Sequence, residues 1–131
     1  MSSPGEVVRT FLERYAAGDR DCWRRVFAED IVWDVSRDQI PGEPTYHGHD
    51  GVERFFVEWL GAWEGYEFEQ LELLESGPYV MSVFRQSGRG KGSGIDIDRT
   101  FHGVYEVRDG LVVSYTGFAR RDEALEATGL S

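Results

Sequence analysis

The sequence predicts an α+β fold in which a curved antiparallel sheet wraps around one long helix. Amphipathic helical patterns are confined to the first half of the chain and to its last residues. Between residues 66 and 120 the pattern instead alternates with a period of two, as strands do. Helices segregated from an antiparallel sheet define the α+β class. A sheet folded around one helix forms a cone-shaped barrel, and the open end of a cone is a cavity.

Two helices and one strand are expected before residue 40. The first helix begins at Ser3 and Pro4, because proline is tolerated where the helical amide lacks a partner anyway. Its apolar residues recur at helical spacing, and Gly18 is expected to cap its end. A short second helix is expected over residues 21–27. The segment DIVWDV (30–35) is short and β-rich, which predicts a strand.

The third helix has the strongest pattern in the chain. It is expected to open in GHDG (48–51), with Asp50 as N-cap and Glu53 completing a capping box in outline. A loop that contains two prolines precedes it. Its apolar stripe consists of Val52, Phe55, Phe56, Trp59, Leu60 and Trp63.

Four strands and a short helix complete the chain. The strands are predicted over 66–75, 79–86, 95–107 and 111–120, with SGP (76–78) and RDG (108–110) as turns. GRGKGSG (88–94) is predicted as a flexible connection. Gly103 and Gly117 fall inside strands, where glycine allows the bends of a curved sheet. The final helix lies in 122–130, with Gly129 as its cap.

Composition and charge exclude several classes of function. The chain has 131 residues, the size of one domain (1–131), and a net charge of −10. A surface this acidic repels phosphate groups, so we expect neither nucleic-acid nor membrane binding. Cys22 is the only cysteine, and the N-terminus has no signal-peptide pattern, which fits a cytoplasmic protein. The histidines lack metal-ligand spacing, so we expect no metal and no cofactor.

Four motifs together resemble those of a known family. They are YAAGDRD (15–21), YHGHDGV (46–52), HGVYEVRDGLVVSY (102–115) and RRDEALEATGL (120–130). In this order they resemble the SnoaL-like polyketide cyclases, within the nuclear transport factor 2-like and ketosteroid isomerase-like superfamily. The resemblance implies a cone-shaped barrel and a homodimer. It does not decide the activity, because this superfamily includes isomerases, cyclases, dehydratases, epoxide hydrolases and non-catalytic proteins.

The resemblance also implies where known catalytic residues would fall. The carbonyl-polarising tyrosine of the ketosteroid isomerases falls at Phe11, their general-base aspartate at Val35, and their protonated aspartate at His102. An essential aspartate of the limonene-epoxide hydrolases falls at Gly117. Both of those reactions are therefore disfavoured. Scytalone dehydratase uses histidines and an aspartate, which His102 with Asp34 matches in residue type only.

The comparison with the superfamily places the face of Thr100, His102 and Val104 inside the cone. His102 then has two interpretations: the polar centre of a cavity, able to act as acid, base or donor, or a histidine that fills the core. The candidate catalytic residues are His102, Tyr115 and Asp34, although the register turns Asp34 away unless the strand bends. Asp38, in the following loop, could reach the mouth of the cavity, but nothing in the sequence favours it as a catalytic residue. The candidate ligand-binding residues are Phe11, Tyr15, Trp33, Val35, Phe56, Trp59, Trp63, Thr100, Val104 and Gly117.

These residues support two hypotheses of different classes. The first is an enzyme that performs cofactor-free acid–base chemistry on a small apolar molecule with a carbonyl or hydroxyl group, as an isomerase, cyclase or dehydratase. The alternative is a non-catalytic protein that binds a small ligand or serves as an accessory dimer. In either case a homodimer is expected to form through the sheet, with contacts from the strands that begin at Tyr79 and Ile95.

Overall fold

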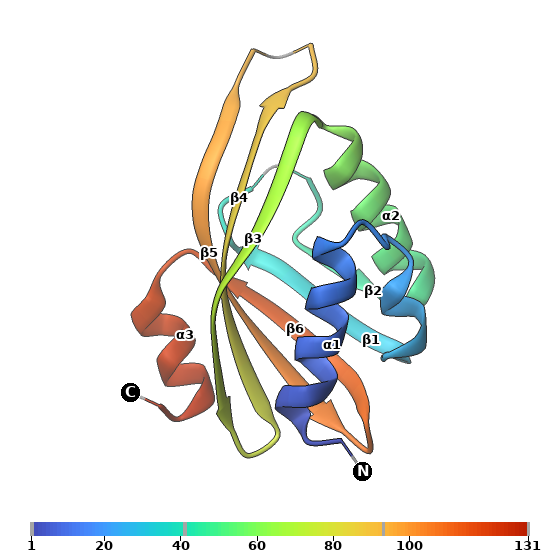
Figure 1. Ribbon diagram of the computed structural model, residues 1–131, viewed down its shortest axis with the longest axis vertical. Helices are drawn as coiled ribbons and strands as arrows, with labels where there is room; N and C mark the ends of the chain where they lie inside the picture. The colour runs from blue at the N-terminus through green and yellow to red at the C-terminus, as the bar shows by residue number, and fades with distance from the viewer. Residues whose placement is uncertain (1, 41, 93, 131) are drawn as a thin grey trace.

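The computed structural model describes residues 2–40, 42–92 and 94–130, and it has the predicted α+β fold. A strongly curved sheet forms a cone, with α1 and α2 on one side and α3 on the other (Figure 1). The first half of the chain contains α1 (Pro4–Ala16), a 3-10 turn (Cys22–Arg25), β1 (Phe27–Arg37), β2 (Thr45–His47) and α2 (Gly48–Gly61). The second half contains β3 (Trp63–Ser76), β4 (Tyr79–Gly90), β5 (Asp96–Arg108), β6 (Leu111–Phe118) and α3 (Arg121–Thr128).

The sheet is mixed rather than purely antiparallel. Its strand order is β2-β1-β6-β5-β4-β3, and β1 pairs in parallel with β6. The expectation of an antiparallel sheet was wrong at this one pair. A parallel pair needs a long crossover connection, and here α2 and β3 to β5 lie between the two strands in the sequence. The short β2 inside the proline-containing loop was not predicted.

Most helix boundaries follow the sequence signals. Ser3 caps α1, and its Oγ accepts a hydrogen bond from the Glu6 amide at 3.2 Å. Gly129 ends α3 with a left-handed φ of 77°, as a C-terminal glycine does. Two expectations were wrong. The second helix is only a 3-10 turn, and α2 begins at Gly48 with His47 in the cap position, so that Asp50 lies in its first turn.

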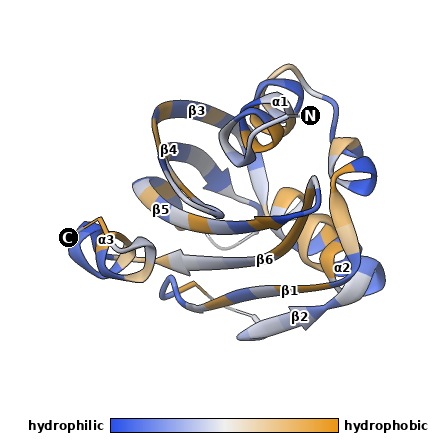
Figure 2. Ribbon diagram, turned by 90° about the horizontal axis from the view of Figure 1, so that it is seen from below, coloured by the Kyte–Doolittle hydropathy of each residue, from blue (hydrophilic) through white to orange (hydrophobic). Residues whose placement is uncertain are grey.

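Apolar side chains cover both faces of the central strands. The larger core fills the concave side, between the sheet and α1 and α2. A smaller cluster lies under α3 on the outer face and consists of Met81, Val83, Val104, Phe118 and Ala124. Figure 2 shows α2 and α3 at opposite ends of β1 and β6. None of the helices within the described residues is long and apolar enough to cross a membrane.

The two-sided core corrects the predicted orientation of β5. Phe101 and Tyr105 belong to the concave core, whereas Val104 belongs to the cluster under α3. The face of Thr100, His102 and Val104 therefore lies outside the cone. The alternation along β5 was predicted correctly, but both faces carry apolar residues, so alternation alone did not say which face is the interior.

Two glycines face each other across β5 and β6 on the concave side. Gly103 is the register partner of Gly117. A Cβ atom at Gly103 would overlap the ring of Tyr115, and a Cβ atom at Gly117 would overlap the carboxyl group of Asp38. Both glycines thus provide space for a neighbouring side chain, in addition to any effect on strand curvature.

Replacing Gly103 by alanine is expected to destabilise the protein by about 1–3 kcal/mol, the usual cost of overpacking a core. The added methyl group would push the buried Tyr115 ring out of its position. Gly61→Ala is the matched control, because nothing lies within 4 Å of a Cβ atom there. Urea unfolding of both variants measures the difference. Equal stability of Gly103→Ala and the wild type would contradict the packing of Tyr115 on the concave face.

Candidate functional site

A cavity of about 40 Å³ lies inside the cone, between α1, α2 and the concave face of the sheet. Its walls are mainly aromatic, and two of its lining residues, Asp38 and Gln86, carry an acid or an amide. An apolar cleft with a few convergent polar groups is the usual form of a small-molecule site. The predicted ligand-binding residues that line it are Phe11, Tyr15, Trp33, Val35, Phe56 and Trp59, together with Tyr115.

The aromatic walls pack against one another across the strand pairs. Trp33 of β1 and Tyr115 of β6 are register partners, and their rings stack with centroids 3.9 Å apart. Phe84 and Phe101 stack in the same way across β4 and β5, at 5.5 Å. Offset and stacked ring pairs add stability beyond the burial of their area. The cavity therefore has walls that are fixed by the sheet itself.

Asp38 is the acidic group of this cavity. It follows the end of β1, where its amide donates to the Val35 carbonyl at 3.1 Å. Only 3% of the residue is exposed, and Oδ1 has no hydrogen-bond partner among the residues that the structure describes. The carboxyl group lies directly against Gly117, where any larger residue would displace it. A buried carboxyl oxygen without a hydrogen bond is costly, even with the Arg99 guanidinium 4.0 Å away, so Asp38 is a candidate for a functional role.

Burial raises the pKa of Asp38 to about 7. Arg99 opposes this rise, and the nearby Asp34 adds to it. The Arg99 guanidinium lies 4.0 Å from Asp38 Oδ1, donates to the Asp38 backbone carbonyl, and stacks over the ring of Phe101. A carboxyl group whose pKa lies near neutrality can both accept and release a proton at physiological pH.

A chain of hydrogen bonds fixes the amide of Gln86. Its Oε1 accepts from Trp59 Nε1 at 3.0 Å and from the hydroxyl of Tyr66. The Tyr66 and Tyr15 hydroxyl oxygens are 2.8 Å apart. Because the Tyr66 proton points to Gln86, Tyr15 must donate to Tyr66. The indole N–H can only donate, so Oε1 must be the atom of the Gln86 amide that faces Trp59.

Tyr115, one of three tyrosines among the described residues of the cavity wall, stays protonated at neutral pH. Burial raises the pKa of Tyr115 well above its ordinary value, and the neighbouring carboxyl of Asp38 raises it further. Tyr115 can therefore donate a hydrogen bond but cannot serve as a base near neutrality. Among the described cavity residues, Asp38 is the group whose pKa comes closest to physiological pH.

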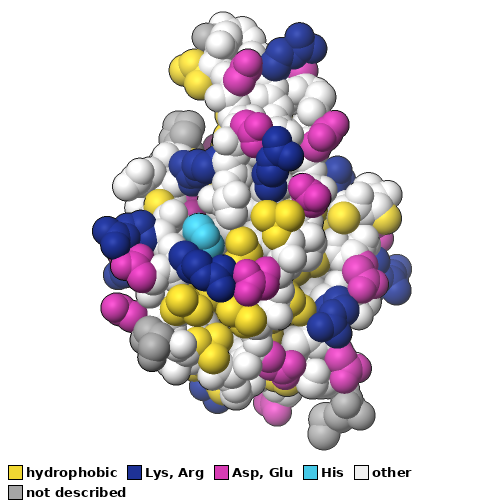
Figure 3. All heavy atoms as spheres, turned by 60° about the vertical axis from the view of Figure 1, so that its left-hand side comes forward, with side chains coloured by type: hydrophobic (Ala, Val, Ile, Leu, Met, Phe, Trp, Pro, Cys, Tyr) yellow, Lys and Arg dark blue, Asp and Glu magenta, His cyan; other side chains and the backbone are white. Residues whose placement is uncertain are grey.

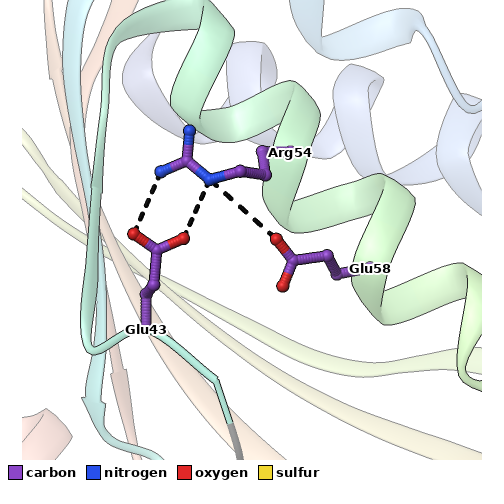
Figure 4. Close-up of polar contacts among 3 residues, drawn as sticks. All are labelled: Glu43, Arg54 and Glu58. Atoms are coloured by element: carbon purple, nitrogen blue, oxygen red, sulfur yellow. Dashed lines mark hydrogen bonds and ion pairs between the residues drawn. The ribbon is translucent and has the colours of Figure 1, made fainter.

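The loop that carries Asp38 is held against α2. Arg54 of α2 binds both carboxylate oxygens of Glu43, at 2.8 and 3.1 Å, and lies 3.9 Å from Glu58 (Figure 4). These groups are about half exposed, and exposed ion pairs contribute little to stability. Their bidentate geometry nevertheless defines where the loop crosses α2.

Two of the predicted catalytic residues, His102 and Asp34, do not line the cavity. His102 lies on the outer face, where it is partly buried and where burial lowers its pKa. Its Nδ1 has no partner in the described part of the chain. Figure 3 shows this side of the molecule, on which apolar, basic and acidic side chains are mixed. Asp34 also points away from the cavity and accepts hydrogen bonds from the amide and hydroxyl of Ser36, at 2.9 and 2.6 Å.

The remaining predicted residues divide between the two faces. Thr100 is exposed and Val104 packs under α3, so neither contributes to the cavity. Trp63 packs edge-to-face against Trp59, with ring centroids 5.4 Å apart, and does not line the cavity. Gly117 is not among the lining residues, but it lies against the carboxyl group of Asp38.

Sequence reasoning did not favour Asp38 and missed Gln86. Asp38 follows a strand within a loop, and no local pattern shows that a glycine far along the chain makes room for its carboxyl group. Gln86 lies two residues after Phe84, so alternation places its side chain on the same concave face of β4. This was a weak signal of a polar group there. In the described ranges, no three His, Cys, Asp or Glu side chains form a metal-ligand set.

The structure is that of a cone-shaped α+β protein whose aromatic cavity is lined by a buried carboxyl group. The model of the SnoaL-like domain family matches residues 8–115, and the chain belongs to this family. No curated protein matches the chain significantly.

Several solved structures share the fold. A nuclear transport factor 2-like protein from Burkholderia thailandensis is 25% identical, with a TM-score of 0.79 over 99% of this chain and 98% of that one. A candidate SnoaL-like polyketide cyclase from Mesorhizobium loti is 19% identical, with a TM-score of 0.74 over 89% and 99%. A protein from Catenulispora acidiphila with a ketosteroid isomerase-like fold, in complex with trimethylamine, is 14% identical, with a TM-score of 0.71 over 96% and 94%.

Replacing Asp38 by asparagine is expected to change the pH dependence of stability. Below pH 4 the carboxyl group is protonated in both the folded and the unfolded chain. Between about pH 4 and 7 the unfolded chain releases this proton while the folded protein keeps it, so the wild type loses stability as the pH rises. Above pH 7, Asp38→Asn should therefore be more stable than the wild type by on the order of 1–4 kcal/mol, relative to their difference at pH 4.

Urea unfolding of both proteins at pH 4 and pH 8 measures this difference. The contributions of the other titrating groups cancel, because the wild type and the variant share them. Asp30→Asn makes the same chemical change at an exposed position of β1 and is not expected to reproduce the gain. A stability difference that is equal at both pH values would contradict the raised pKa of Asp38.

Proposed function

We propose that this protein binds a small, largely apolar molecule in the cone and moves a proton on it through Asp38, without a cofactor. The observation that carries this proposal is the position of Asp38: a buried carboxyl group with an unpartnered oxygen and a pKa near 7, inside an aromatic cavity. Membership of the SnoaL-like family supports chemistry of this kind, because the similar structures include a candidate polyketide cyclase.

The geometry supports a reaction by proton abstraction next to a carbonyl group. Charged Asp38 takes a proton from the carbon beside the carbonyl. The C–H bond breaks, its electron pair forms a carbon–carbon double bond, and the carbonyl oxygen gains the negative charge. In a β,γ-unsaturated ketone this charge is shared with the γ-carbon, and protonated Asp38 returns the proton there, so that the carbon–carbon double bond moves into conjugation with the carbonyl group. The result is an isomer, and no external oxidant or reductant is needed.

The surroundings of Asp38 favour this proton transfer. Aromatic walls exclude water, which strengthens electrostatic interactions within the site. Arg99 lies close enough to stabilise the charged carboxylate without forming a tight ion pair with it. The carboxyl group can therefore alternate between its two protonation states near neutral pH.

The size of the cavity limits the ligand. A buried water occupies roughly 10–15 Å³ by the same measure, so 40 Å³ corresponds to about three waters. A ligand of about five or six non-hydrogen atoms needs only small adjustments of the walls. A polycyclic ligand would require the loop of Asp38 or helix α2 to move.

A second candidate function is the binding of a small amine without catalysis. Aromatic rings and a carboxylate together attract an ammonium group, and the cavity contains both. The similar protein from C. acidiphila is in complex with trimethylamine. Binding of trimethylammonium, with no proton exchange on any carbonyl compound, would favour this alternative.

The proposed reaction is tested with pent-4-en-2-one, a small ketone whose α-hydrogens are acidic. In D₂O the wild type is expected to accelerate the exchange of these hydrogens, and the rate should rise through about pH 7 as Asp38 ionises. Asp38→Asn should lower the enzyme-dependent rate at least 100-fold, in the range expected for the loss of a general base. Proton NMR follows the exchange.

Asp30→Asn is the control, since it removes an exposed carboxylate of the same strand that is not among the groups shifting the pKa of Asp38, and it should retain the wild-type rate. Unchanged exchange by Asp38→Asn, or a wild-type rate no greater than that of buffer, would overturn the proposed function.

A further inference from the structure

We propose that Gln86 donates a hydrogen bond to a carbonyl oxygen of the ligand, so that the ligand of this cavity is a small neutral carbonyl compound. This inference rests on the proposed function and specifies its substrate class. It assigns Gln86 as the group that holds the oxygen while Asp38 acts on the neighbouring carbon.

The orientation of the Gln86 amide follows from its partners. Trp59 and Tyr66 both donate to Oε1, so this oxygen is turned toward them. The amide is planar, which directs the two hydrogens of Nε2 away from both partners. Within the described residues, no acceptor is bonded to Nε2, although only 7% of the residue is exposed and the residue lines the cavity. Nε2 is not one of the fully buried unpartnered atoms, so this amide donor is fixed in direction and still accessible at the cavity.

A second N–H group of the wall also lacks an acceptor. Trp33 Nε1 is buried and is unpartnered among residues 2–40, 42–92 and 94–130. Buried donors without partners are uncommon in folded proteins and call for an explanation such as a bound ligand. Two donors and one carboxyl group of this cavity lack hydrogen-bond partners within the described residues, and a ligand that brings an acceptor can pair with a donor while it leaves the carboxyl group free to react.

This set of groups selects among classes of ligand. A hydrocarbon would leave all three groups unpaired, and an ammonium ion could pair only with Asp38. An alcohol could pair with both Gln86 and Asp38, but its hydroxyl proton would occupy the carboxylate that the proposed reaction needs free. A carbonyl oxygen brings two lone pairs and no proton, so it can accept from Gln86 while its α-hydrogen faces Asp38.

The same hydrogen bond would assist the proposed proton transfer. When Asp38 removes the α-proton, negative charge develops on the carbonyl oxygen. A donor that is already aimed at this oxygen stabilises the charge without having to reorganise. The bonds from Trp59 and Tyr66 to Oε1, with Tyr15 behind Tyr66, also polarise the amide and make Nε2 a better donor.

The test uses pentan-2-one, a ketone of similar size that cannot isomerise. In the wild type, the infrared C=O stretch of the bound ketone should move to lower frequency than in an apolar solvent. Gln86→Met removes the donor at nearly constant volume. It should abolish most of this shift and weaken binding about tenfold, as the loss of one hydrogen bond does. Its exchange rate with pent-4-en-2-one should fall about 10²-fold.

Gln70→Met is the matched control. Gln70 lies outside the cavity lining, where Nε2 donates to the Glu72 carbonyl and Oε1 accepts from the hydroxyl of Ser82. This variant should keep the wild-type frequency and affinity. A second measurement needs no substitution: in ¹H–¹⁵N spectra of the wild type, the side-chain amide protons of Gln86 should move downfield when pentan-2-one is added.

The outcomes separate this inference from the proposed function. If Asp38→Asn abolishes exchange but Gln86→Met keeps the wild-type frequency and affinity, Gln86 does not hold the carbonyl and the inference is wrong. If tetramethylammonium binds more tightly than pentan-2-one and leaves the Gln86 amide protons unchanged, the ligand class is wrong. If the Gln86→Met variant does not fold, the NMR measurement on the wild type decides. Amide protons of Gln86 that do not shift when pentan-2-one is added would then overturn the inference.

Discussion

The parallel pairing of β1 with β6 is the constraint on which the rest of the structure depends. It joins β1 to the last strand of the C-terminal meander, so that one curved sheet runs from β2 to β3. The register of this pair puts Trp33 opposite Tyr115, and their stacked rings form a continuous wall. At the end of the same pair, the Ala119 amide donates to the Arg37 carbonyl at 3.1 Å, and the chain then turns inward at Asp38. The position of the acid thus follows from strand pairing.

The cavity concentrates polar groups that an ordinary core would avoid. Burying a carboxyl group, an amide and an indole N–H among aromatic rings costs free energy unless each finds a partner. Trp59 and Tyr66 satisfy the oxygen of the Gln86 amide, and among the described residues Asp38 Oδ1 and Trp33 Nε1 are buried without a hydrogen bond. Such a half-satisfied arrangement is typical of a preorganised site, where the ligand supplies the missing partners.

Much of this fold could be predicted from the sequence, because each element has a local signal. Ser3 and Gly129 mark helix ends, and the aromatic stripe of α2 identifies the face that Phe56 and Trp59 turn to the cavity. The interior face of β5 could not be predicted, since α3 buries Val104 on the outer side as thoroughly as the cone buries Phe101. The comparison with the superfamily assigned His102 to the wrong face, and the alternation along β5 could not reveal the error. The expected homodimer stays a prediction.

The site itself depends on contacts between residues far apart in the sequence. Asp38 becomes buried only because residue 117 is a glycine, and Gln86 becomes a fixed donor only because Trp59 and Tyr66 meet at its oxygen. Neither relation leaves a pattern in a single sequence. The comparison with the superfamily indicated the pocket but not the group that acts in it, which is consistent with a fold that supports many unrelated chemistries.

The most direct test of this account is the titration of Asp38 itself. A protein labelled with ¹³C at the aspartate carboxyl groups reports each protonation state through its chemical shift, and Asp38→Asn assigns the resonance. The account predicts that the Asp38 signal titrates with a midpoint near pH 7. A midpoint near 4, the ordinary value of an aspartate, would show that the carboxyl group is solvated and would contradict the central role given to it.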